Sequence, residues 1–396
     1  MNILIAWIAQ FVGHNGGMDK VFVRFANEMR RRGHTVTLAY CTEHEGKIYT
    51  PIHPAVRVIN IAQYLPGHKW ESHKTTAFKI KREILRLVGK TYMLNYTRKW
   101  GSYYLQPGIQ KLLKEVQPDV VVTMDAKATA AIKVGDPKNR YPVITMSHFN
   151  AEYILNDISA FEKKMLMRGN VVQVLMPHDL QIFKQAFPGI HLVYIPNIVP
   201  QYDISLAEKK ESYKIVNVAR LDKKQKRQHL LIEAFAQIAN KYPNWKVEFW
   251  GEEQESSKYG DYLRSLVKKY QLEKQVFLMG NAAHVIDVYE NADIFAFPSL
   301  FEGFGLAMTE AMSAGLPVIA YQSCPAVNEL VRNGENGLLV KEGIDALATG
   351  LEWLITHKEK RITMGQQAQR DMASYAAERI WNQWENLLIQ TLRQKH

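Results

Sequence analysis

Short apolar strands alternate with amphipathic helices along this chain, and this alternation limits the fold more than any other feature. The first strand, Ile3 to Ala9, is continuously apolar, as is typical of a strand buried on both faces of a sheet. A helix from Val21 to Arg32 follows, and the next strand runs from Thr35 to Tyr40. This order predicts a parallel, doubly wound sheet, because a crossover helix returns the chain to the same end of the sheet.

The same pattern continues in two blocks. In the first block we expect further strands at Asp119–Met124, Val143–Met146 and Val171–Met176. A polar stretch, Gln201 to Ser212, precedes a second block, with expected strands at Lys214–Val218, Lys246–Trp250, Val276–Met279, Ile294–Phe297 and Pro317–Ala320. Because 396 residues suit two domains of roughly 100–200 residues each, we predict two Rossmann-like α/β domains, residues 1–199 and 200–375, facing a central cleft.

Two long helices are also expected in the second half. One runs from Gln228 to Lys241, and the other ends the chain, from Ala376 to Gln394. The terminal helix places Trp381, Trp384 and Leu388 at helical spacing, so one side of it is apolar. We expect residues 376–396 to pack back on the N-terminal domain.

Composition excludes several classes of protein. Apolar residues make up 47% and charged residues 22% of the chain, so it is not intrinsically disordered. Only two cysteines occur, Cys41 and Cys324, which argues against a disulfide scaffold and suits a reducing cytoplasm. The start of the chain lacks a basic signal-peptide segment, and no apolar run reaches the ~18 residues of a spanning helix. We therefore expect a cytoplasmic protein, free or peripheral on the inner face of the plasma membrane.

The net charge of +11 is concentrated in one half of the chain. Residues 1–199 contain 26 Lys and Arg and 14 Asp and Glu, a balance of +12. Residues 200–396 contain 24 and 25, a balance of −1. The excess positive charge is therefore a property of the expected N-terminal domain.

The segment from Pro298 to Pro317 carries the most chemical information. A strand ends at its start, Gly303 and Gly305 precede a helix, Glu302 lies in the loop, and Glu310 lies about one and a half turns into the helix. Glycines at a helix start let a phosphate approach the backbone, and the free N–H groups favour an anion. Glu310 can then reach the hydroxyls of a ribose, with Glu302 at the other end of the ligand. An ordinary helix with two solvated acids is the alternative.

This segment resembles the retaining nucleotide-sugar glycosyltransferases of family 4, which have the two-domain GT-B fold. Their acid motif, Glu, seven residues, Glu, is matched by Glu302 and Glu310. Further matches occur in the family's order at Gly16-Gly17-Met18, His148, Ile195-Pro-Asn197, Val218-Ala-Arg220-Leu-Asp, Trp250-Gly-Glu, Phe277-Leu-Met-Gly280 and Ala292-Asp293. The resemblance implies that the C-terminal domain binds the donor and the N-terminal domain binds the acceptor.

The resemblance also implies roles for individual residues. Arg220 and Lys226 would hold the diphosphate, and Glu310 the ribose. Glu302 and the backbone near Phe304 would hold the donor sugar, opposite His148. The complete set of expected catalytic and donor-binding positions is Gly16, Gly17, His148, Arg220, Lys226, Gly251, Met279, Glu302, Gly303, Phe304, Gly305, Leu306 and Glu310.

Arg220 and Lys226 belong to a basic segment, and composition alone would also suit a solvated loop. An arginine can bind phosphate with two parallel donors, and a lysine acts as a point charge. Fixed cations stabilise the charge that builds on a diphosphate leaving group. No two aspartates occur at i, i+2, so the D-x-D site of metal-dependent sugar transferases is missing. We therefore expect neither a metal nor a cofactor.

The expected N-terminal site residues have simpler alternatives. Gly16 and Gly17 follow the first strand, where a plain tight turn would also use glycines. His148 follows the strand that ends at Met146, and a lone histidine there can be structural. The resemblance places the glycine loop near the donor phosphates and His148 near the transferred sugar.

A basic, aromatic stretch between Gly67 and Glu115 indicates a different kind of contact. It contains eleven Lys and Arg and three Glu. Helical spacing places Ile80, Ile84, Leu87 and Val88 on one face and Lys79, Arg82, Arg86 and Lys90 on the opposite face. Such a helix suits an anionic membrane surface, and a helix packed on the sheet with a solvated basic face is the alternative. No nucleic-acid-binding module accompanies the charge, so we expect no nucleic acid partner.

The missing D-x-D site and the family resemblance together predict a metal-independent hexosyltransferase, and the resemblance implies that it is retaining and which donor and acceptor it uses. It would move a sugar from a nucleotide-diphosphate donor, with UDP favoured, to a hydroxyl of a lipid-linked, cell-surface or protein-linked glycan. One alternative is a nucleotide-sugar epimerase or hydrolase of the same fold. Another is a non-catalytic module that binds membrane or nucleic acid.

Overall fold

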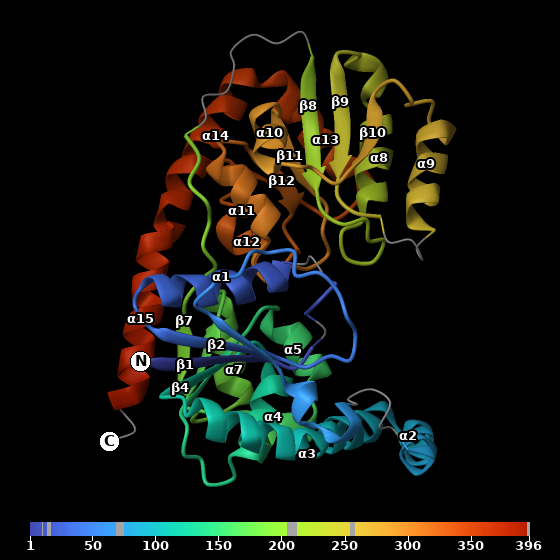
Figure 1. Cartoon of the computed structure of the whole chain (residues 1–396). Coiled ribbons are helices and arrows are strands. Elements are labelled where there is room, and N and C mark those ends of the chain that lie inside the picture. Colours follow the sequence, from blue (N-terminus) through green and yellow to red (C-terminus); the bar gives the residue numbers. More distant parts are fainter. Residues whose placement is uncertain (10, 14–16, 69–74, 204–211, 254–257, 394–396) are drawn as a thin grey trace. The chain divides into compact units, whose positions relative to one another are not determined.

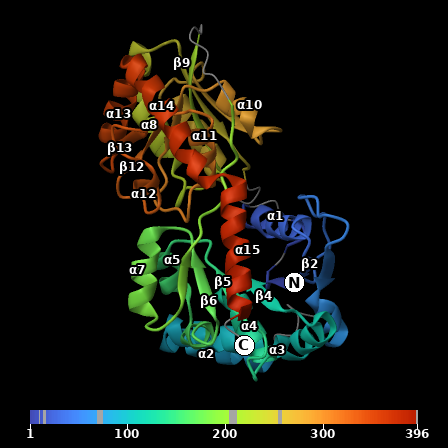
Figure 2. The ribbon, with the colours of Figure 1, turned by 90° about the vertical axis from the view of Figure 1, so that its left-hand side faces the viewer.

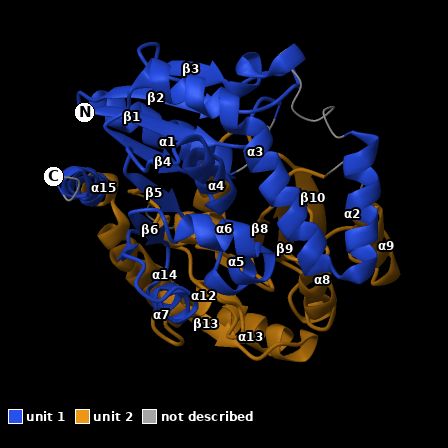
Figure 3. Cartoon of the chain, turned by 90° about the horizontal axis from the view of Figure 1, so that it is seen from below, with its two compact units in different colours: residues 1–195, 381–396 blue, residues 196–380 orange. Residues whose placement is uncertain are grey.

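The chain forms two compact units, each built on its own sheet (Figure 1). The computed structural model describes residues 1–9, 11–13, 17–68, 75–203, 212–253 and 258–393. Unit 1 comprises Met1–Ile195 and Trp381–His396, and unit 2 comprises Pro196–Ile380. Figure 3 shows the two units in different colours. The division falls after Ile195 rather than after residue 199, and the end of the chain belongs to unit 1.

Unit 1 contains a seven-stranded sheet in the order β3-β2-β1-β4-β5-β6-β7. All of its strand pairs are parallel. The strands are β1 (Asn2–Trp7), β2 (Thr35–Tyr40), β3 (Arg57–Asn60), β4 (Val120–Thr123), β5 (Val143–Met146), β6 (Val171–Val174) and β7 (Leu192–Tyr194). The order reverses between β1 and β4, which is where ligands of such sheets usually bind.

Helices cover both faces of this sheet. Figure 1 shows α1 on one face and α3 and α4 on the other. The helices are α1 (Gly17–Arg31), α2 (Thr76–Val88), α3 (Lys90–Val116), α4 (Ala126–Gly135), α5 (Ala151–Asp157), α6 (Ala160–Leu166) and α7 (Pro177–Ala186), with 3-10 turns η1 (Ile61–Tyr64) and η2 (Pro66–His68). Ile109 and Leu112 of α3 pack with Leu4 and Val121 of the sheet in one buried cluster.

The last helix, α15 (Ala377–Arg393), lies along unit 1 (Figure 2). Its Trp384 meets Phe25 of α1 edge to face, with ring centroids 5.0 Å apart. Arg32, just after α1, forms an ion pair with Glu385 at 2.7 Å. The apolar stripe of α15 is therefore buried on unit 1.

Unit 2 contains a six-stranded parallel sheet in the order β10-β9-β8-β11-β12-β13. Its strands are β8 (Tyr213–Val218), β9 (Trp245–Trp250), β10 (Val276–Gly280), β11 (Ile294–Phe297), β12 (Val318–Tyr321) and β13 (Gly337–Val340). Its helices are α8 (Gln228–Ala236), α9 (Tyr259–Lys269), α10 (Val285–Glu290), α11 (Leu306–Ser313), α12 (Val327–Leu330), α13 (Ile344–Thr356) and α14 (Lys358–Met372), with η3 (Ala239–Lys241) and η4 (Ala373–Tyr375). Leu231 of α8 and Leu351 of α13 lie in its main core cluster, with Val247 of β9.

One expected helix is shorter than its apolar pattern suggests. The prediction of a single helix from Gln228 to Lys241 is wrong, since α8 ends at Ala236 and η3 is a separate turn. The N–H groups of Gln237 and Ile238 donate to the oxygens of Ala234 and Phe235, three residues back. The last turn has therefore tightened into the 3-10 form, which ends the helix.

The apolar residues of α2 do not face the sheet. Phe78 is the buried residue of this helix, and its ring lies 4.4 Å from that of Trp100 in α3. Ile80 and Leu87 are 57% and 86% exposed. The alternative that α2 packs its apolar face on the sheet is therefore wrong. Within the described residues, no helix combines the length and apolar character needed to cross a bilayer.

Candidate active site

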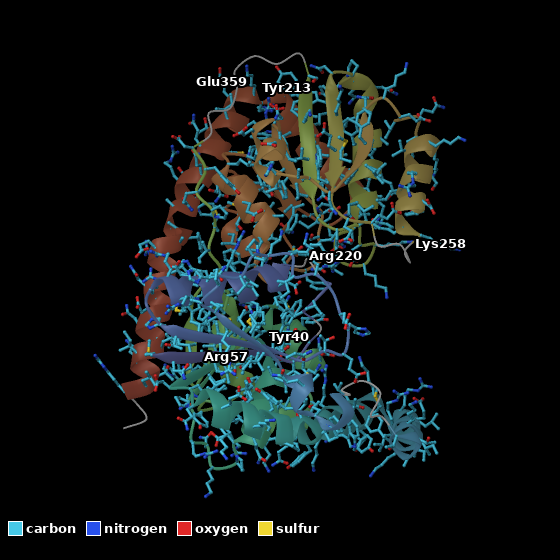
Figure 4. The ribbon with its side chains drawn as sticks, viewed as in Figure 1. Tyr40, Arg57, Tyr213, Arg220, Lys258 and Glu359 are labelled. Atoms are coloured by element: carbon cyan, nitrogen blue, oxygen red, sulfur yellow. The ribbon has the colours of Figure 1, made fainter. Side chains whose placement is uncertain are left out.

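Neighbouring strands bring most of the expected donor-site residues to one edge of the unit 2 sheet. Arg220 follows β8, Glu302 follows β11, and Gly251 follows β9, while Met279 lies near the end of β10. These four strands are adjacent in the order β10-β9-β8-β11 and run parallel, so their carboxyl ends meet at the same edge. Figure 4 labels Arg220 at this edge. Ligands of open parallel sheets bind at such an edge.

The structure joins Lys226 and Glu302 directly. Lys226 Nζ donates to Glu302 Oε1 over 2.6 Å, and the two side chains are only 13% and 8% exposed. Lys226 Nζ also lies 5.4 Å from the centre of the Phe297 ring. A buried carboxylate needs such a partner, because an unpaired charge away from water is costly. An anionic ligand that approaches Lys226 therefore meets a cation whose position is already set by Glu302.

Further hydrogen bonds tie the two loops of this edge together. The N–H of Leu300 donates to the oxygen of Gln225 over 2.8 Å, and Gln225 Nε2 donates to the oxygen of Phe301 over 3.1 Å. Arg227 Nε donates to the oxygen of Pro298 over 3.0 Å. Gln225 and Arg227 thus position the loop that carries Glu302. Their roles were not predicted, although both lie in the basic segment that the sequence singled out.

Arg220 lies near the start of the loop between β8 and α8, and its side chain is half exposed. Its Nη2 donates to Gln225 Oε1 over 2.7 Å and to Asp222 Oδ2 over 3.1 Å. Burial raises the pKa of the Asp222 carboxyl, but the backbone N–H of Gln225 and the Arg220 guanidinium outweigh it and lower that pKa. The guanidinium is therefore held in place on one side while its other side remains accessible.

Gly251 allows β9 to pass close to the residue before Arg220. A Cβ atom at this position would lie 2.0 Å from the oxygen of Ala219 and 3.0 Å from the nitrogen of Arg220. Its φ of +149° is also a conformation that residues with side chains rarely adopt. Only glycine therefore fits at position 251, where the backbone packs against the start of the loop that carries Arg220.

We expect Gly251→Ala to lower the free energy of unfolding by about 2–3 kcal/mol, since it adds a clash to an unfavourable φ. Urea denaturation of unit 2 measures this loss. Gly280→Ala is the matched control, because Gly280 has a φ of +74° but no atom within 4 Å of an added Cβ. Equal losses in the two variants would show that the contact with Ala219 contributes nothing.

The glycine-rich loop after β11 leads into α11 as expected. Gly305 is the N-cap of the helix with a φ of +76°, and no described side chain caps the helix start. The backbone N–H groups of the first turn are therefore not satisfied by a side-chain cap. Gly303 and Phe304 lie in the loop before Gly305, and Leu306 is the first residue of α11.

Glu310 of α11 has a partner that the sequence did not indicate. Tyr289 of α10 donates its hydroxyl to the oxygen of Ala307 over 3.1 Å, and the same hydroxyl lies 3.5 Å from Glu310 Oε2. Burial, followed by the charge of Glu310, raises the pKa of Tyr289 well above its ordinary value. Tyr289 positions both the helix backbone and the carboxylate. No local pattern could have revealed this contact, because it joins two separate helices.

Unit 1 contains a cavity of about 210 Å³ at the carboxyl ends of its strands. His148 follows β5 and lines this cavity together with Met18 of α1, the neighbour of Gly17. The Nε2 atom of His148 is buried and has no hydrogen-bond partner among the described residues. Burial lowers the pKa of this imidazole to about 4, so the ring is neutral at physiological pH. Gly16 lies outside the described residues.

Two cations also line this cavity, and both have partners. Arg98 Nη2 contacts Asp157 Oδ2 at 3.1 Å, and its Nε lies 3.5 Å from Glu162 Oε1. Lys127 Nζ donates to the oxygen of Ile8 over 2.8 Å. Two aromatic residues lie at the mouth, Phe149 and Tyr153, which are 39% and 44% exposed. Neither the two cations nor the two aromatic residues were predicted from the sequence.

The four basic residues that were expected to share one helical face lie on two separate helices. Lys79, Arg82 and Arg86 lie on α2, whereas Lys90 is the first residue of α3. The expectation that Lys90 shares one helical face with the other three is wrong, because α2 ends at Val88. No group of three metal-binding side chains occurs within the described part of the chain.

Family models match both halves of the chain. The model described as "Glycosyltransferase Family 4" matches residues 15–200, and the model described as "Glycosyl transferases group 1" matches residues 200–371. The two matches meet at residue 200 and together reach from residue 15 to residue 371. The chain belongs to the group 1 glycosyltransferases, with the family 4 domain in its N-terminal half.

Curated relatives agree with this assignment. An uncharacterized glycosyltransferase of Haemophilus influenzae is 23% identical over 97% of this chain and 99% of that protein. A poly(ribitol-phosphate) alpha-N-acetylglucosaminyltransferase of Staphylococcus aureus is 26% identical over 76% of this chain and 62% of that protein. The match to the second relative therefore spans less than two thirds of its length.

Solved structures share the fold over nearly the whole chain. Sucrose-phosphate synthase from Thermosynechococcus elongatus has a TM-score of 0.74 at 19% identity and covers 99% of both chains. HepE from Anabaena, in complex with UDP, has a TM-score of 0.72 at 20% identity and covers 98% of this chain and 100% of that chain. The predicted fold class is confirmed, since the two parallel α/β units have the architecture of GT-B glycosyltransferases.

Proposed function

We propose that this glycosyltransferase moves a sugar from a UDP-sugar to a hydroxyl of a cell-envelope glycan and retains the anomeric configuration. The observation that carries the proposal is the buried Lys226–Glu302 pair beside Arg220, at the carboxyl edge of the unit 2 sheet. The complex of HepE with UDP supports the choice of nucleotide. The S. aureus relative, named for a poly(ribitol-phosphate) acceptor, supports the class of acceptor.

In this proposal each donor-site residue has one task. Arg220 binds the diphosphate through its accessible guanidinium, and Lys226 adds a charge beside it. The backbone N–H groups at the start of α11 donate hydrogen bonds to a further phosphate oxygen or to the oxygen of a sugar hydroxyl. Glu310, held by Tyr289, accepts hydrogen bonds from the ribose, and Glu302 accepts them from the donor sugar. Gly251 and Met279 line the nucleotide side of the site.

The charge on the leaving diphosphate is offset by these cations without a metal or another cofactor. As the bond from the anomeric carbon to phosphate breaks, negative charge grows on the diphosphate, and fixed cations stabilise it more than they stabilise the ground state. The acceptor attacks from the face the phosphate leaves, and the departing phosphate takes the hydroxyl proton. This front-face route explains retention without a covalent nucleophile.

The unit 1 cavity is proposed to bind the acceptor. The rings of Phe149 and Tyr153, whose centroids are 5.0 Å apart, offer apolar faces for a sugar ring at its mouth. His148, which is neutral at physiological pH, can donate a hydrogen bond to the transferred sugar or accept one from it. The glycine loop at Gly16 and Gly17 is proposed to contact the donor phosphates. We propose that the protein acts at the inner face of the plasma membrane.

Product analysis tests this function. The protein is incubated with UDP-sugars and with short glycan or polyol-phosphate acceptors, and the products are followed by NMR. We expect transfer only when donor and acceptor are both present, with the donor's anomeric configuration kept in the product. We also expect the same rate in EDTA, because no step uses a metal.

Three outcomes would contradict the proposal. Isomerised or free sugar without any acceptor product would identify an epimerase or a hydrolase. An inverted product would overturn the front-face route. A loss of activity in EDTA that added Mg²⁺ or Mn²⁺ restores would overturn metal independence.

A further inference from the structure

The proposed reaction does not use the most exposed apolar surface of unit 1. The five most exposed large apolar side chains of the described residues are Leu87, Val88, Tyr92, Ile80 and Ile84, between 56% and 86% exposed. Four of them lie on α2. We call the outer face of this helix the α2 surface, formed by Lys79, Ile80, Lys81, Ile84, Arg86, Leu87 and Val88.

The apolar residues of the α2 surface form one continuous stripe. At 100° per residue, Ile80, Ile84, Leu87 and Val88 fall within an arc of about 100°. Phe78 points the other way, where its ring lies 5.3 Å from Tyr96 and 4.4 Å from Trp100 of α3. This contact fixes the orientation of α2, so the stripe cannot turn inward without breaking the aromatic cluster.

Basic side chains flank the stripe on both sides. Lys81 lies on one side, and Lys79 and Arg86 lie on the other, and all three are exposed. From Thr76 to Lys90 the chain carries five basic residues and one acid, Glu83. The carboxylate of Glu83 is already paired with Arg82 at 2.7 Å and with Arg86 at 3.0 Å. The surface is therefore apolar at its centre and cationic at its edges.

The position of α2 in unit 1 leaves the α2 surface uncovered by that unit. Figure 1 shows α2 at the periphery of unit 1, and Figure 3 shows it beside α3. Tyr92, just into α3, extends the exposed apolar area and is 63% exposed. An apolar face this exposed, on a helix held by one neighbour, needs a partner that supplies both apolar volume and negative charge.

We propose that the α2 surface docks on an anionic lipid bilayer, with α2 lying in the plane of the interface. Ile80, Ile84, Leu87 and Val88 would enter the boundary between headgroups and acyl chains, and the flanking cations would pair with lipid phosphates. Charge complementarity selects this occupant. A second copy of the chain would bring the same cations together, and like charges in contact are unfavourable.

This inference deepens the proposed location of the reaction at a membrane but does not depend on transfer. The basic residues of the surface belong to the half of the chain that carries a balance of +12. Docking through α2 would hold unit 1, with its cavity, at the surface where a lipid-linked glycan is presented. Binding is measured without donor or acceptor, so its failure and the failure of the proposed reaction are distinguishable.

Vesicle co-sedimentation tests the inference. The full chain is mixed with vesicles of phosphatidylglycerol and phosphatidylcholine in equal parts, or with phosphatidylcholine alone. We expect sedimentation with the mixed vesicles and much less with the neutral ones. Replacing Lys79, Lys81 and Arg86 by Gln should lower the partition coefficient about a hundredfold, since each cation contributes about fivefold.

A matched control removes the same charge elsewhere. Lys138, Lys184 and Lys274 are exposed residues outside the α2 surface, and their replacement by Gln lowers the net charge equally. The control variant should keep most of its vesicle binding. Leu87→Ser tests the apolar stripe, with Met167→Ser, at a 40% exposed position just after α6, as its control. We expect only Leu87→Ser to weaken binding.

Several results would overturn the inference. No sedimentation of the wild-type chain with mixed vesicles would do so directly. Equal losses in the α2 and control variants would show that general charge, and not this surface, binds the lipid. A dimer in solution that Leu87→Ser converts to a monomer would identify a second copy as the occupant. Transfer to a short soluble acceptor should be unchanged in every α2 variant, which also shows that the variants are folded.

Discussion

Replacing Arg220 with alanine is expected to lower kcat/KM by about 10²–10³-fold while leaving the free energy of unfolding nearly unchanged. The guanidinium is half exposed, and its ion pair with Asp222 at 3.1 Å is a surface pair, which contributes about 0–1 kcal/mol to stability. We propose that it stabilises the negative charge that grows on the leaving diphosphate. Removing one fixed hydrogen-bond donor of this kind lowers the rate by about 10²–10³-fold. Steady-state kinetics with the preferred UDP-sugar, together with urea denaturation, measure both quantities.

Two further variants sharpen this test. Arg220→Lys keeps the charge but loses the planar pair of donors, so we expect an activity between those of wild type and Arg220→Ala. Arg264→Ala is the matched control, because Arg264 is an exposed, ion-paired arginine of α9 outside the proposed site. Its kinetics should equal those of wild type. Near-normal turnover in Arg220→Ala would remove Arg220 from the diphosphate site.

Replacing Lys226 with methionine is expected to abolish transfer and to destabilise unit 2 by about 3–5 kcal/mol. Glu302 would be left as a buried carboxylate without its cation, and breaking one side of a buried pair costs about that much. The same variant removes a cation from beside the leaving diphosphate. Urea denaturation and single-turnover assays separate the two effects.

The double variant Lys226→Met with Glu302→Gln separates folding from catalysis. It removes both charges, so most of the lost stability should return, whereas transfer should stay at least about 10³-fold below wild type. Glu302→Gln alone should keep the fold, since Lys226 can still contact the amide oxygen. If the double variant is as unstable as Lys226→Met, the pair does not stabilise the loop. If it is active, the proposed site is wrong.

The sequence predicted the sheets well where strands are buried on both faces. β4 and β11 are fully buried and stand out as apolar runs. β3 and β7 were not predicted, because they lie at the two edges of the unit 1 sheet and are only partly buried. An edge strand has one strand neighbour, so it does not need the continuous apolar pattern that marks a central strand.

The residues of the proposed donor site could be predicted from the sequence, but the contacts between them could not. Glu302, Glu310, Arg220 and Lys226 were recognised from their spacing and from the family resemblance. Their partners came from the fold, because Lys226 and Glu302 are 76 residues apart and meet across adjacent strands. Tyr289 was missed for the same reason.

The α2 helix gives a second case in which the sequence predicted the residues and only the structure showed their contacts. Helical spacing predicted an amphipathic, basic helix, but spacing does not say what an apolar face contacts. Packing on the sheet and docking on a membrane require the same pattern of residues. The contact of Phe78 with α3 excludes packing of this face on the sheet of unit 1, since it turns Ile80 and Leu87 outward, and docking on a membrane is our proposal.

The sequence by itself determined the class of fold and the family, because buried strands and a glycine-rich helix start leave local patterns of apolar residues and glycines. Only the tertiary structure decided which charges pair, which carboxylate is buried and which apolar stripe is left uncovered. The physical reason is that these properties depend on contacts between residues far apart in the chain. Such contacts are set by the order of strands in the sheet and by the packing of one helix on another, and neither is encoded in the spacing of neighbouring residues.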